Sequence, residues 1–408
     1  MINRKNVLLQ HLNALKKVLL RAPLLTNSGY GVHSRQLFTW LHGRPDVELV
    51  VECLQWGRTA WMIDQELENG LVGKIMGCSK EFDKSNIDIS FQVQLPDEWD
   101  TTLGKINIGV TALVETDRCS RKWVEQCNKM DHVVVPSKFT KNVLRRSGAV
   151  IKPVTVIPEW YNPHLINKSQ VSKTLNDSRY DIIKEPFNIL MIGTLTSQVK
   201  EDDRKNLVNT IKWVSEEFKN NEDVAILLKT NFGKGTTLDK KLCKEYLSKL
   251  KSSLGLSAFP KIKLIHGNMT SQEIAALYSH SKVKLYVSAT RGEGYGLPLI
   301  EAAVTGLPIV ATGWSGHLQF LNREKFGFVD YTMTEISESR VDGRIFEKGF
   351  KWAEPLEDSF KKEIRKVYDD YKTAKLKARD MMKDIRIEFS SASIKTQYDE
   401  LFERYSEK

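Results

Sequence analysis

One short segment of the sequence combines glycines, a proline and two glutamates in a pattern suited to a phosphorylated sugar. In RGEGYGLPLIEAAVTGLPIVAT (291–312), glycine recurs at Gly292, Gly294 and Gly296, so the backbone can approach a ligand closely. Pro298 stands where the first turn of a helix is expected, and the free N–H groups of such a turn attract phosphate. Glu293 and Glu301 flank that turn, and carboxylates accept hydrogen bonds from sugar hydroxyls. The alternative is a tight turn without a ligand.

The whole segment resembles the family-4 retaining glycosyltransferases of the GT-B fold, whose signature is a Glu-x7-Glu motif in a glycine-rich βα element. Glu293 and Glu301 have that spacing, and G-Y-G-L-P and G-L-P-I-V-A-T also match. The resemblance extends from about Lys17 to Leu321 and is weaker in the tail. It implies that Glu293 contacts the transferred sugar and that Glu301 holds the ribose hydroxyls of the nucleotide. The backbone that meets the sugar and phosphate would be that of Gly294, Tyr295, Gly296 and Leu297.

The resemblance also implies two basic residues after the first strand of the C-terminal half, which bind the diphosphate. Lys205 fits the family lysine, whereas Thr194, directly after Gly193, stands where many members have arginine. We expect Arg204, adjacent to Lys205, to act as the second cation. A helix is predicted at 205–218. Cations at a helix N-terminus are slightly unfavourable, so an exposed helix start is the weaker interpretation of this pair.

Two loops of the N-terminal half are candidates for the opposite wall of the site. Gly29 and Gly31, in NSGYGVHSRQL (27–37), precede a helical pattern, and their N–H groups would face the diphosphate. An ordinary βα turn is the alternative. Glu115 and Asp117 lie in a loop that lines the sugar and acceptor site in the family. One of them would orient the acceptor hydroxyl, which must lose its proton.

For Glu115 and Asp117 there is also an interpretation without a catalytic role. The neighbouring cations Arg118 and Arg121 offer each carboxylate a simple ion pair, and for Asp117 we favour that interpretation. Trp314 and His317 are further candidates to line the acceptor cleft, although a buried tryptophan more often serves packing.

The elements that position these residues form two series of strands alternating with helices. The first series of strands is predicted at 17–22, 47–54, 87–93, 106–110 and 132–136; the second is predicted at 187–193, 224–230, 261–267, 284–290 and 307–312. Continuous apolar strands alternating with helices predict parallel sheets covered on both faces. The fold class is therefore α/β, with two Rossmann-like domains facing a central cleft, which is the GT-B architecture.

The predicted domain boundaries follow from these two series. Residues 1–160 form an N-terminal, acceptor-side domain, and residues 161–385 form a C-terminal domain that binds the nucleotide sugar. Residues 386–408 form a helical tail that returns to the N-terminal domain.

Composition excludes several classes of protein. With 408 residues, of which 41% are hydrophobic and 27% charged, the chain has enough apolar residues for packed cores and is not disordered. No window approaches the ~18 apolar residues of a membrane span, and the N-terminus lacks the pattern of a signal peptide. Five cysteines without a C-x-x-C pair predict neither disulfides nor structural zinc. We expect a cytoplasmic enzyme that needs no metal and no cofactor besides its donor substrate.

The acceptor is left open by the sequence. Net charge is +10, and residues 118–152 carry nine basic side chains against only Glu125 and Asp131. Such a segment attracts a polyanion, an anionic membrane surface or an acidic substrate, or is simply a solvated helix face. A saccharide, a lipid-linked glycan, a small molecule and a hydroxymethylated DNA base are the candidate acceptors.

Two functions other than transfer are compatible with the same motifs. GT-B chains include nucleotide-sugar epimerases, and Thr194 at the family's arginine position keeps an inactive nucleotide-sugar-binding protein open. The presence of both Glu293 and Glu301 argues against a degenerate site. The nucleotide base, the sugar and the oligomeric state are not determined by the sequence.

Overall fold

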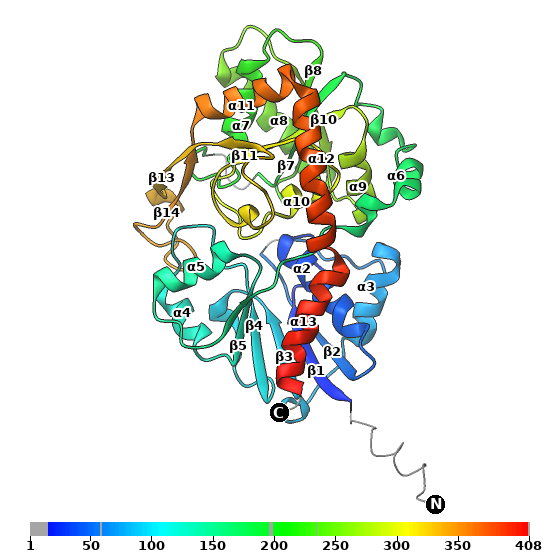
Figure 1. Cartoon of the computed structure of the whole chain (residues 1–408), viewed down its shortest axis with the longest axis vertical. Helices are drawn as coiled ribbons and strands as arrows, with labels where there is room; N and C mark the ends of the chain where they lie inside the picture. Colours follow the sequence, from blue (N-terminus) through cyan, green and yellow to red (C-terminus); the bar gives the residue numbers. More distant parts are fainter. Residues whose placement is uncertain (1–14, 58, 196–198, 234, 407–408) are drawn as a thin grey trace, which may run out of the picture.

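Two α/β domains lie one above the other, and the chain crosses between them twice (Figure 1). The computed structural model describes residues 15–57, 59–195, 199–233 and 235–406; the first 14 residues, on which the expected absence of a signal peptide mainly rests, lie outside it. Each domain contains a six-stranded sheet in which all neighbouring strands are parallel. The predicted fold class is confirmed.

The first domain is built around residues 16–156. Its strands are β1 (Lys16–Ala22), β2 (Val47–Cys53), β3 (Ile89–Val93), β4 (Ile106–Val110), β5 (His132–Val135) and β6 (Val154–Val156). Its main helices are α2 (Gly29–His42), α3 (Leu67–Cys78), α4 (Arg121–Cys127) and α5 (Lys138–Ser147). The strands are almost entirely buried from β3 to β5, as the continuous apolar runs predict.

The second domain is built around residues 187–329. Its strands are β7 (Phe187–Ile192), β8 (Val224–Thr230), β9 (Lys261–His266), β10 (Val283–Ser288), β11 (Ile309–Thr312) and β12 (Gly327–Val329). Its helices are α7 (Leu207–Glu217), α8 (Thr237–Leu254), α9 (Ser271–Ser279) and α10 (Leu297–Val304), and α6 (Lys168–Thr174) precedes the sheet and packs on α9. Alternate residues of β7 enter different core clusters, with Leu190 in one and Ile189 in the other, so both faces of the sheet are covered.

The strand orders place a topological switch point in each sheet. The orders are β2-β1-β3-β4-β5-β6 and β12-β11-β10-β7-β8-β9. In the second sheet, the chain winds in opposite directions from the adjacent strands β7 and β10. Ligands of open α/β sheets bind at such a point, outside the carboxyl ends of the strands. The loops after β7 and β10 are therefore the expected site.

The C-terminal helices connect the two domains. Helix α11 (Glu357–Asp369) and α12 (Tyr371–Glu388) pack on the second domain, and α13 (Ser391–Ser406) runs down the first (Figure 1). The apolar face of α13, made of Ile394, Tyr398, Leu401 and Phe402, belongs to the same core cluster as β1 and α2. Trp40 Nε1 donates to Asp399 Oδ1 at 2.8 Å, which fixes the register of α13 on α2.

A β-hairpin that the sequence analysis did not predict extends from the second domain to the first. Strands β13 (Tyr331–Glu335) and β14 (Lys351–Pro355) pair antiparallel, and we call residues 331–355 the cross-domain hairpin. Its apolar residues Ile336, Phe346, Phe350 and Trp352 share a core cluster with Trp99, Val114 and Trp123 of the first domain. Four of the five residues of β13 are exposed, so the strand contains no apolar run that a pattern search would find.

The predicted strand positions agree closely with the structure. Each of the ten predicted segments contains a strand, whereas the three-residue edge strands β6 and β12 are too short to give a pattern. No described helix has the length and apolar composition needed to cross a bilayer.

Candidate active site

The loops after β7 and β10 bring three charged side chains together. Lys205 Nζ lies 2.7 Å from Glu293 Oε1 and 2.8 Å from Glu293 Oε2. Arg204 Nη1 lies 3.6 Å from Glu293 Oε2. Glu115, from the loop after β4 in the first domain, completes the group, with its Oε1 3.2 Å from Arg204 Nη2. Four of the five predicted catalytic candidates thus form one cluster that spans the two domains.

Charge balance within this cluster keeps Glu293 ionised. Glu293 is buried, which by itself would raise the pKa of its carboxyl, but Lys205 and Arg204 outweigh burial and lower that pKa to about 2. Burial would likewise lower the pKa of Arg204, and the carboxylates of Glu115 and Glu293 raise it instead. The cluster therefore holds two basic side chains and two carboxylates at the mouth of the predicted crevice.

The position of the two cations depends on how α7 begins. We predicted a helix from Lys205, but α7 begins at Leu207, so both cations lie in the preceding loop. Asp203 caps the helix, because its Oδ2 accepts from Leu207 N at 2.8 Å, and Asn206 adopts a left-handed backbone with φ 53°. The cations consequently point toward Glu293 instead of lying along the helix.

The glycines of the motif permit contact between the domains. A Cβ at Gly292 would lie 2.5 Å from the carbonyl oxygen of Glu115, and one at Gly294 would lie 2.9 Å from the carbonyl oxygen of Ala112. The carbonyl of Gly294 accepts hydrogen bonds from Ser137 Oγ at 2.7 Å and Thr140 Oγ1 at 3.2 Å. Both positions therefore need a residue without a side chain, because the backbone of the first domain lies close to each of them.

A serine and a histidine that follow β11 hold the backbone of Glu293. Ser315 Oγ accepts from Glu293 N at 2.9 Å, and His317 Nδ1 lies 3.4 Å from the same hydroxyl. His317 Nε2 donates to the carbonyl oxygen of Thr312 at 2.7 Å, and burial lowers the pKa of His317, so the ring is neutral and Nδ1 accepts from Ser315. Sequence reasoning named His317 as a cleft residue and missed Ser315, whose only signal is its place after a glycine-rich strand end.

Glu301 lies apart from this cluster, near Tyr278 and Lys229. It is half-buried on α10, and burial raises the pKa of its carboxyl to about 8, although Tyr278 and Lys229 partly offset that rise. Lys229, on β8, is a residue that the sequence analysis missed, because a lone lysine in the strand VAILLKT looks like an edge residue. Burial lowers the pKa of Lys229. The two glutamates of the Glu-x7-Glu motif therefore have opposite pKa shifts.

The remaining donor-binding candidates occupy several positions around the crevice. Gly193 N donates to Lys229 O at 3.2 Å, and Thr194 is exposed. Gly296, with φ 103°, and Leu297 begin α10. The Tyr295 side chain points away from the cluster, because its hydroxyl donates to the carbonyl oxygen of Glu159 at 2.6 Å.

The first-domain loops differ in how they meet the cluster. Gly29 and Gly31 lie inside the first turn of α2, not before it, and Gly31 N donates to Ser28 Oγ at 3.0 Å. Asp117 does not join the cluster. Its Oδ1 accepts from Lys351 N at 2.7 Å, and its Oδ2 lies 3.6 Å from Arg118 Nε, so it pairs with the cross-domain hairpin and with its neighbour.

One group of potential metal ligands occurs among the described residues, between α8 and β9. Asp239, Cys243 and His266 offer ligand atoms within 4.8 Å of one another. Asp239 already accepts hydrogen bonds from Phe232 N and from His266 Nε2, the latter at 2.7 Å. These contacts have hydrogen-bond geometry, and they hold the loop after β8 against the end of β9.

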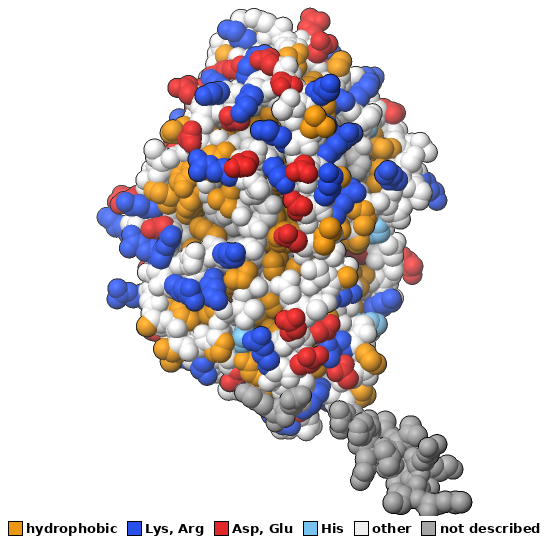
Figure 2. Space-filling view, viewed as in Figure 1, with side chains coloured by type: hydrophobic (Ala, Val, Ile, Leu, Met, Phe, Trp, Pro, Cys, Tyr) orange, Lys and Arg blue, Asp and Glu red, His pale blue; other side chains and the backbone are white. Residues whose placement is uncertain are grey.

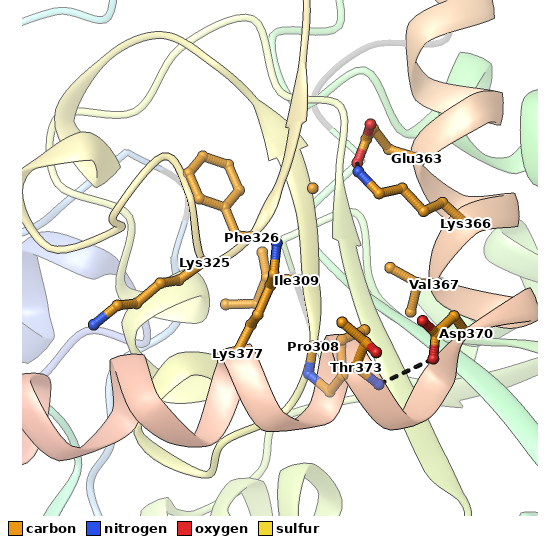
Figure 3. A pocket seen from close by; sticks show the side chains of 12 residues that line it. Pro308, Ile309, Lys325, Phe326, Glu363, Lys366, Val367, Asp370, Thr373 and Lys377 are labelled. Carbon is orange, nitrogen blue, oxygen red and sulfur yellow. Dashed lines mark hydrogen bonds and ion pairs between the residues drawn. The ribbon is translucent and has the colours of Figure 1, made fainter.

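A separate hollow lies at the outer edge of the second domain, where α11 and α12 pass the edge strand β12 (Figure 3). Its floor is apolar, with Ile309, Phe326 and Val367, and its rim carries Lys366 and Lys377. It contains no part of the Glu293 cluster.

Comparison with known proteins agrees with this fold. Residues 253–394 match the family described as "Family 4 Glycosyltransferase in conflict systems". No curated protein matches the chain. Solved structures that share the whole fold include a glycosyltransferase from Rickettsia africae, with a TM-score of 0.65 and 14% identity over 96% of this chain and 99% of that chain. Sucrose-phosphate synthase from Thermosynechococcus elongatus has a TM-score of 0.63 and 15% identity over 95% of this chain and 98% of that chain. Anabaena HepE in complex with UDP and glucose has a TM-score of 0.62 and 14% identity over 95% of this chain and 100% of that chain. The resemblance seen in the sequence is confirmed.

Proposed function

We propose that this chain, a GT-B glycosyltransferase similar to family 4, moves a sugar from a nucleotide-diphosphate sugar to an acceptor hydroxyl with retention of configuration. The observation that carries the proposal is the buried Glu293 carboxylate held by Lys205 and Arg204 at the crevice between β7 and β10. Anabaena HepE was solved with UDP-glucose, so UDP is the first nucleotide to test.

The mechanism follows from the charges in the cluster. When the bond between the anomeric carbon and the diphosphate breaks, negative charge grows on the leaving oxygen, and Lys205 and Arg204 would neutralise it without a metal ion. The acceptor oxygen then bonds to the anomeric carbon from the same face, and its proton passes to the leaving phosphate. A carboxyl with a pKa of about 2 is a poor base, so Glu293 would accept hydrogen bonds from the sugar. We expect EDTA to leave the rate unchanged.

A thermal-shift titration with UDP, GDP, ADP and their sugar conjugates tests donor binding. Ligand at 100 times its Kd should stabilise the fold by about 2.7 kcal/mol. Lys205→Ala should abolish the shift, whereas Lys200→Ala, whose side chain is exposed in the same loop, should retain it. Absence of a shift with every nucleotide in the wild type would contradict the proposal and favour a degenerate site.

The first candidate acceptors are a saccharide, a lipid-linked glycan and a small molecule. A basic surface on the first domain favours a polyanionic acceptor as the second candidate. Figure 2 shows Lys and Arg side chains gathered over α4 and α5. Among the described residues, Arg118 is the one cation of 118–152 that pairs with a carboxylate, and Lys141 Nζ donates to the carbonyl oxygen of Val154. The other seven cations have no described carboxylate within 4 Å: Arg121, Lys122, Lys129, Lys138, Arg145, Arg146 and Lys152. Ser137 and Thr140, at the start of α5, contact Gly294, so this surface begins at the rim of the site.

Salt dependence separates the acceptor classes. A nucleic acid, such as DNA with a hydroxymethylated base, would bind with a log–log salt slope of up to about −6 if all seven cations meet phosphates. Undetectable binding at low salt would remove that candidate, and co-sedimentation with anionic vesicles would favour a membrane acceptor instead. Conversion of a nucleotide sugar in the absence of any acceptor would indicate an epimerase.

A further inference from the structure

The loop that carries Arg204 and Lys205 is held by one buried arginine. Arg291 lies between β10 and the Gly292–Gly296 motif, and its side chain is only 5% exposed. Arg291 Nη1 donates to the carbonyl oxygens of Lys200 at 2.7 Å and Asp203 at 2.8 Å. Arg291 N donates to the carbonyl oxygen of Arg204 at 2.9 Å. Three carbonyls of residues 200–204 thus depend on Arg291.

Strand β14 of the cross-domain hairpin holds Arg291 in turn. Arg291 Nε donates to Glu354 Oε2 at 2.5 Å, and Arg291 Nη2 donates to Glu354 Oε1 at 3.0 Å. Ala353 N donates to the carbonyl oxygen of Arg291 at 3.1 Å, and the Trp352 ring faces the guanidinium at 5.4 Å. A buried guanidinium is costly unless it is fully paired, and this two-point ion pair supplies the missing partner.

The same strand is bonded to the first domain one residue before Trp352. Lys351 N donates to Asp117 Oδ1 at 2.7 Å, and Asp117 N donates to the carbonyl oxygen of Lys351 at 2.7 Å. From Lys351 to Glu354, four consecutive residues therefore contact either the first domain or Arg291.

We propose that Arg291 and Glu354 are positioning residues for the diphosphate, and that β14 couples the contact between the two domains to the placement of Arg204 and Lys205. The inference rests on the proposed function and extends it to residues outside the Glu-x7-Glu motif. Neither side chain contacts the cluster directly, so their effect on a ligand must pass through the loop at 200–205. A ligand group that the loop does not hold, such as the nucleoside, should be insensitive to them.

The test compares a nucleoside diphosphate with the matching monophosphate by calorimetry. The probe is whichever of UDP, GDP and ADP stabilises the wild type, so a wild type that binds none of them contradicts the proposed function, not this inference alone. Glu354→Gln and Arg291→Lys should each reduce the preference for the diphosphate about tenfold, while affinity for the monophosphate stays within about twofold. Equal loss of both affinities, or no loss, would overturn the inference.

Three further variants separate positioning from simple docking of the hairpin. Asp117→Ala removes the acceptor for Lys351 N and should lower the diphosphate preference, whereas Asp117→Asn, which keeps an acceptor oxygen, should restore it. Arg344→Ala removes the exposed ion pairs from the hairpin tip to Asp97 and Glu98. Because it leaves β14 and Arg291 intact, it should not change the preference. A loss in Arg344→Ala as large as in Glu354→Gln would overturn the inference.

Discussion

Lys205 binds both carboxylate oxygens of Glu293, at 2.7 Å and 2.8 Å, so the cation expected to hold a diphosphate is paired with the carboxylate expected to hold the sugar. Arg204 shares the same carboxylate and also reaches Glu115. A diphosphate must therefore compete with two carboxylates for these cations. The two functions of the site are coupled through one ion pair.

Glu293→Gln should separate binding of the diphosphate from transfer of the sugar. The neutral amide releases Lys205, so the nucleoside diphosphate should bind at least as tightly as in the wild type. Transfer should fall by about 10²-fold, since the carboxylate that accepts from the sugar is lost. Calorimetry with the diphosphate and initial rates with the full donor measure the two effects. Loss of diphosphate binding together with activity would indicate that Glu293 maintains the site structurally.

Gly294→Ala should force the domains apart. The added Cβ would lie 2.9 Å from both the carbonyl oxygen and the Cβ of Ala112, and the surrounding backbone is fixed by Ser137 and Thr140. We expect destabilisation by about 1–3 kcal/mol and loss of transfer.

Gly29→Ala is the matched control, because a Cβ there meets no atom within 4 Å and its φ is not positive. Its stability should be unchanged or slightly higher, as alanine reduces the entropy of the unfolded chain. A loss of donor binding without a loss of stability in this variant would place Gly29 against the ligand. Equal stability of Gly294→Ala and wild type would contradict the close contact with Ala112.

The strands and the motif were predictable because their signals are local. Buried parallel strands are continuous apolar runs, and the spacing from Glu293 to Glu301 is read directly from the chain. Residues whose role depends on distant partners were not predictable. Ser315 matters through Glu293 N, and Asp117 through a hairpin more than 200 residues away. Neither partner leaves a pattern in the flanking sequence.

The cross-domain hairpin shows the same limit at the level of an element. Its strand β13 is polar and exposed, and its apolar residues are spread between the strands. Most of the surface that buries them belongs to the first domain. The predicted start of α7 was wrong for a related reason, since the cap at Asp203 and the left-handed Asn206 make the helix begin later than propensity indicates, at Leu207.

Glu159→Gln should make the protein less sensitive to pH. Burial raises the pKa of Glu159 to about 8 from 4.5, and its Oε2 is a buried oxygen without a described partner. The folded state therefore keeps a proton that the unfolded chain releases above pH 4.5, so this residue's contribution to stability falls as pH rises from 4.5 to 8.

Tm measured at pH 5 and pH 8 checks this. Glutamine cannot ionise, so the Tm of Glu159→Gln should rise relative to that of the wild type toward pH 8. Each kcal/mol of stability that the wild type loses corresponds to about 2–4 °C in Tm. Glu125→Gln, an exposed control, should track the wild type at both pH values. A constant difference across this range would show that Glu159 is ionised in the folded state.

Phe402→Ala should unfold the first domain at lower temperature, although residue 402 is far in sequence from that sheet. Phe402 is fully buried in the cluster formed with β1 and α2, and Arg44 lies over its ring with 4.3 Å between the guanidinium carbon and the ring centroid. Truncating a buried phenylalanine costs about 3–5 kcal/mol. Glu400→Ala, on the exposed face of α13, should cost less than about 0.5 kcal/mol. Denaturant unfolding of both variants gives the comparison, and equal costs would show that α13 does not stabilise the first domain.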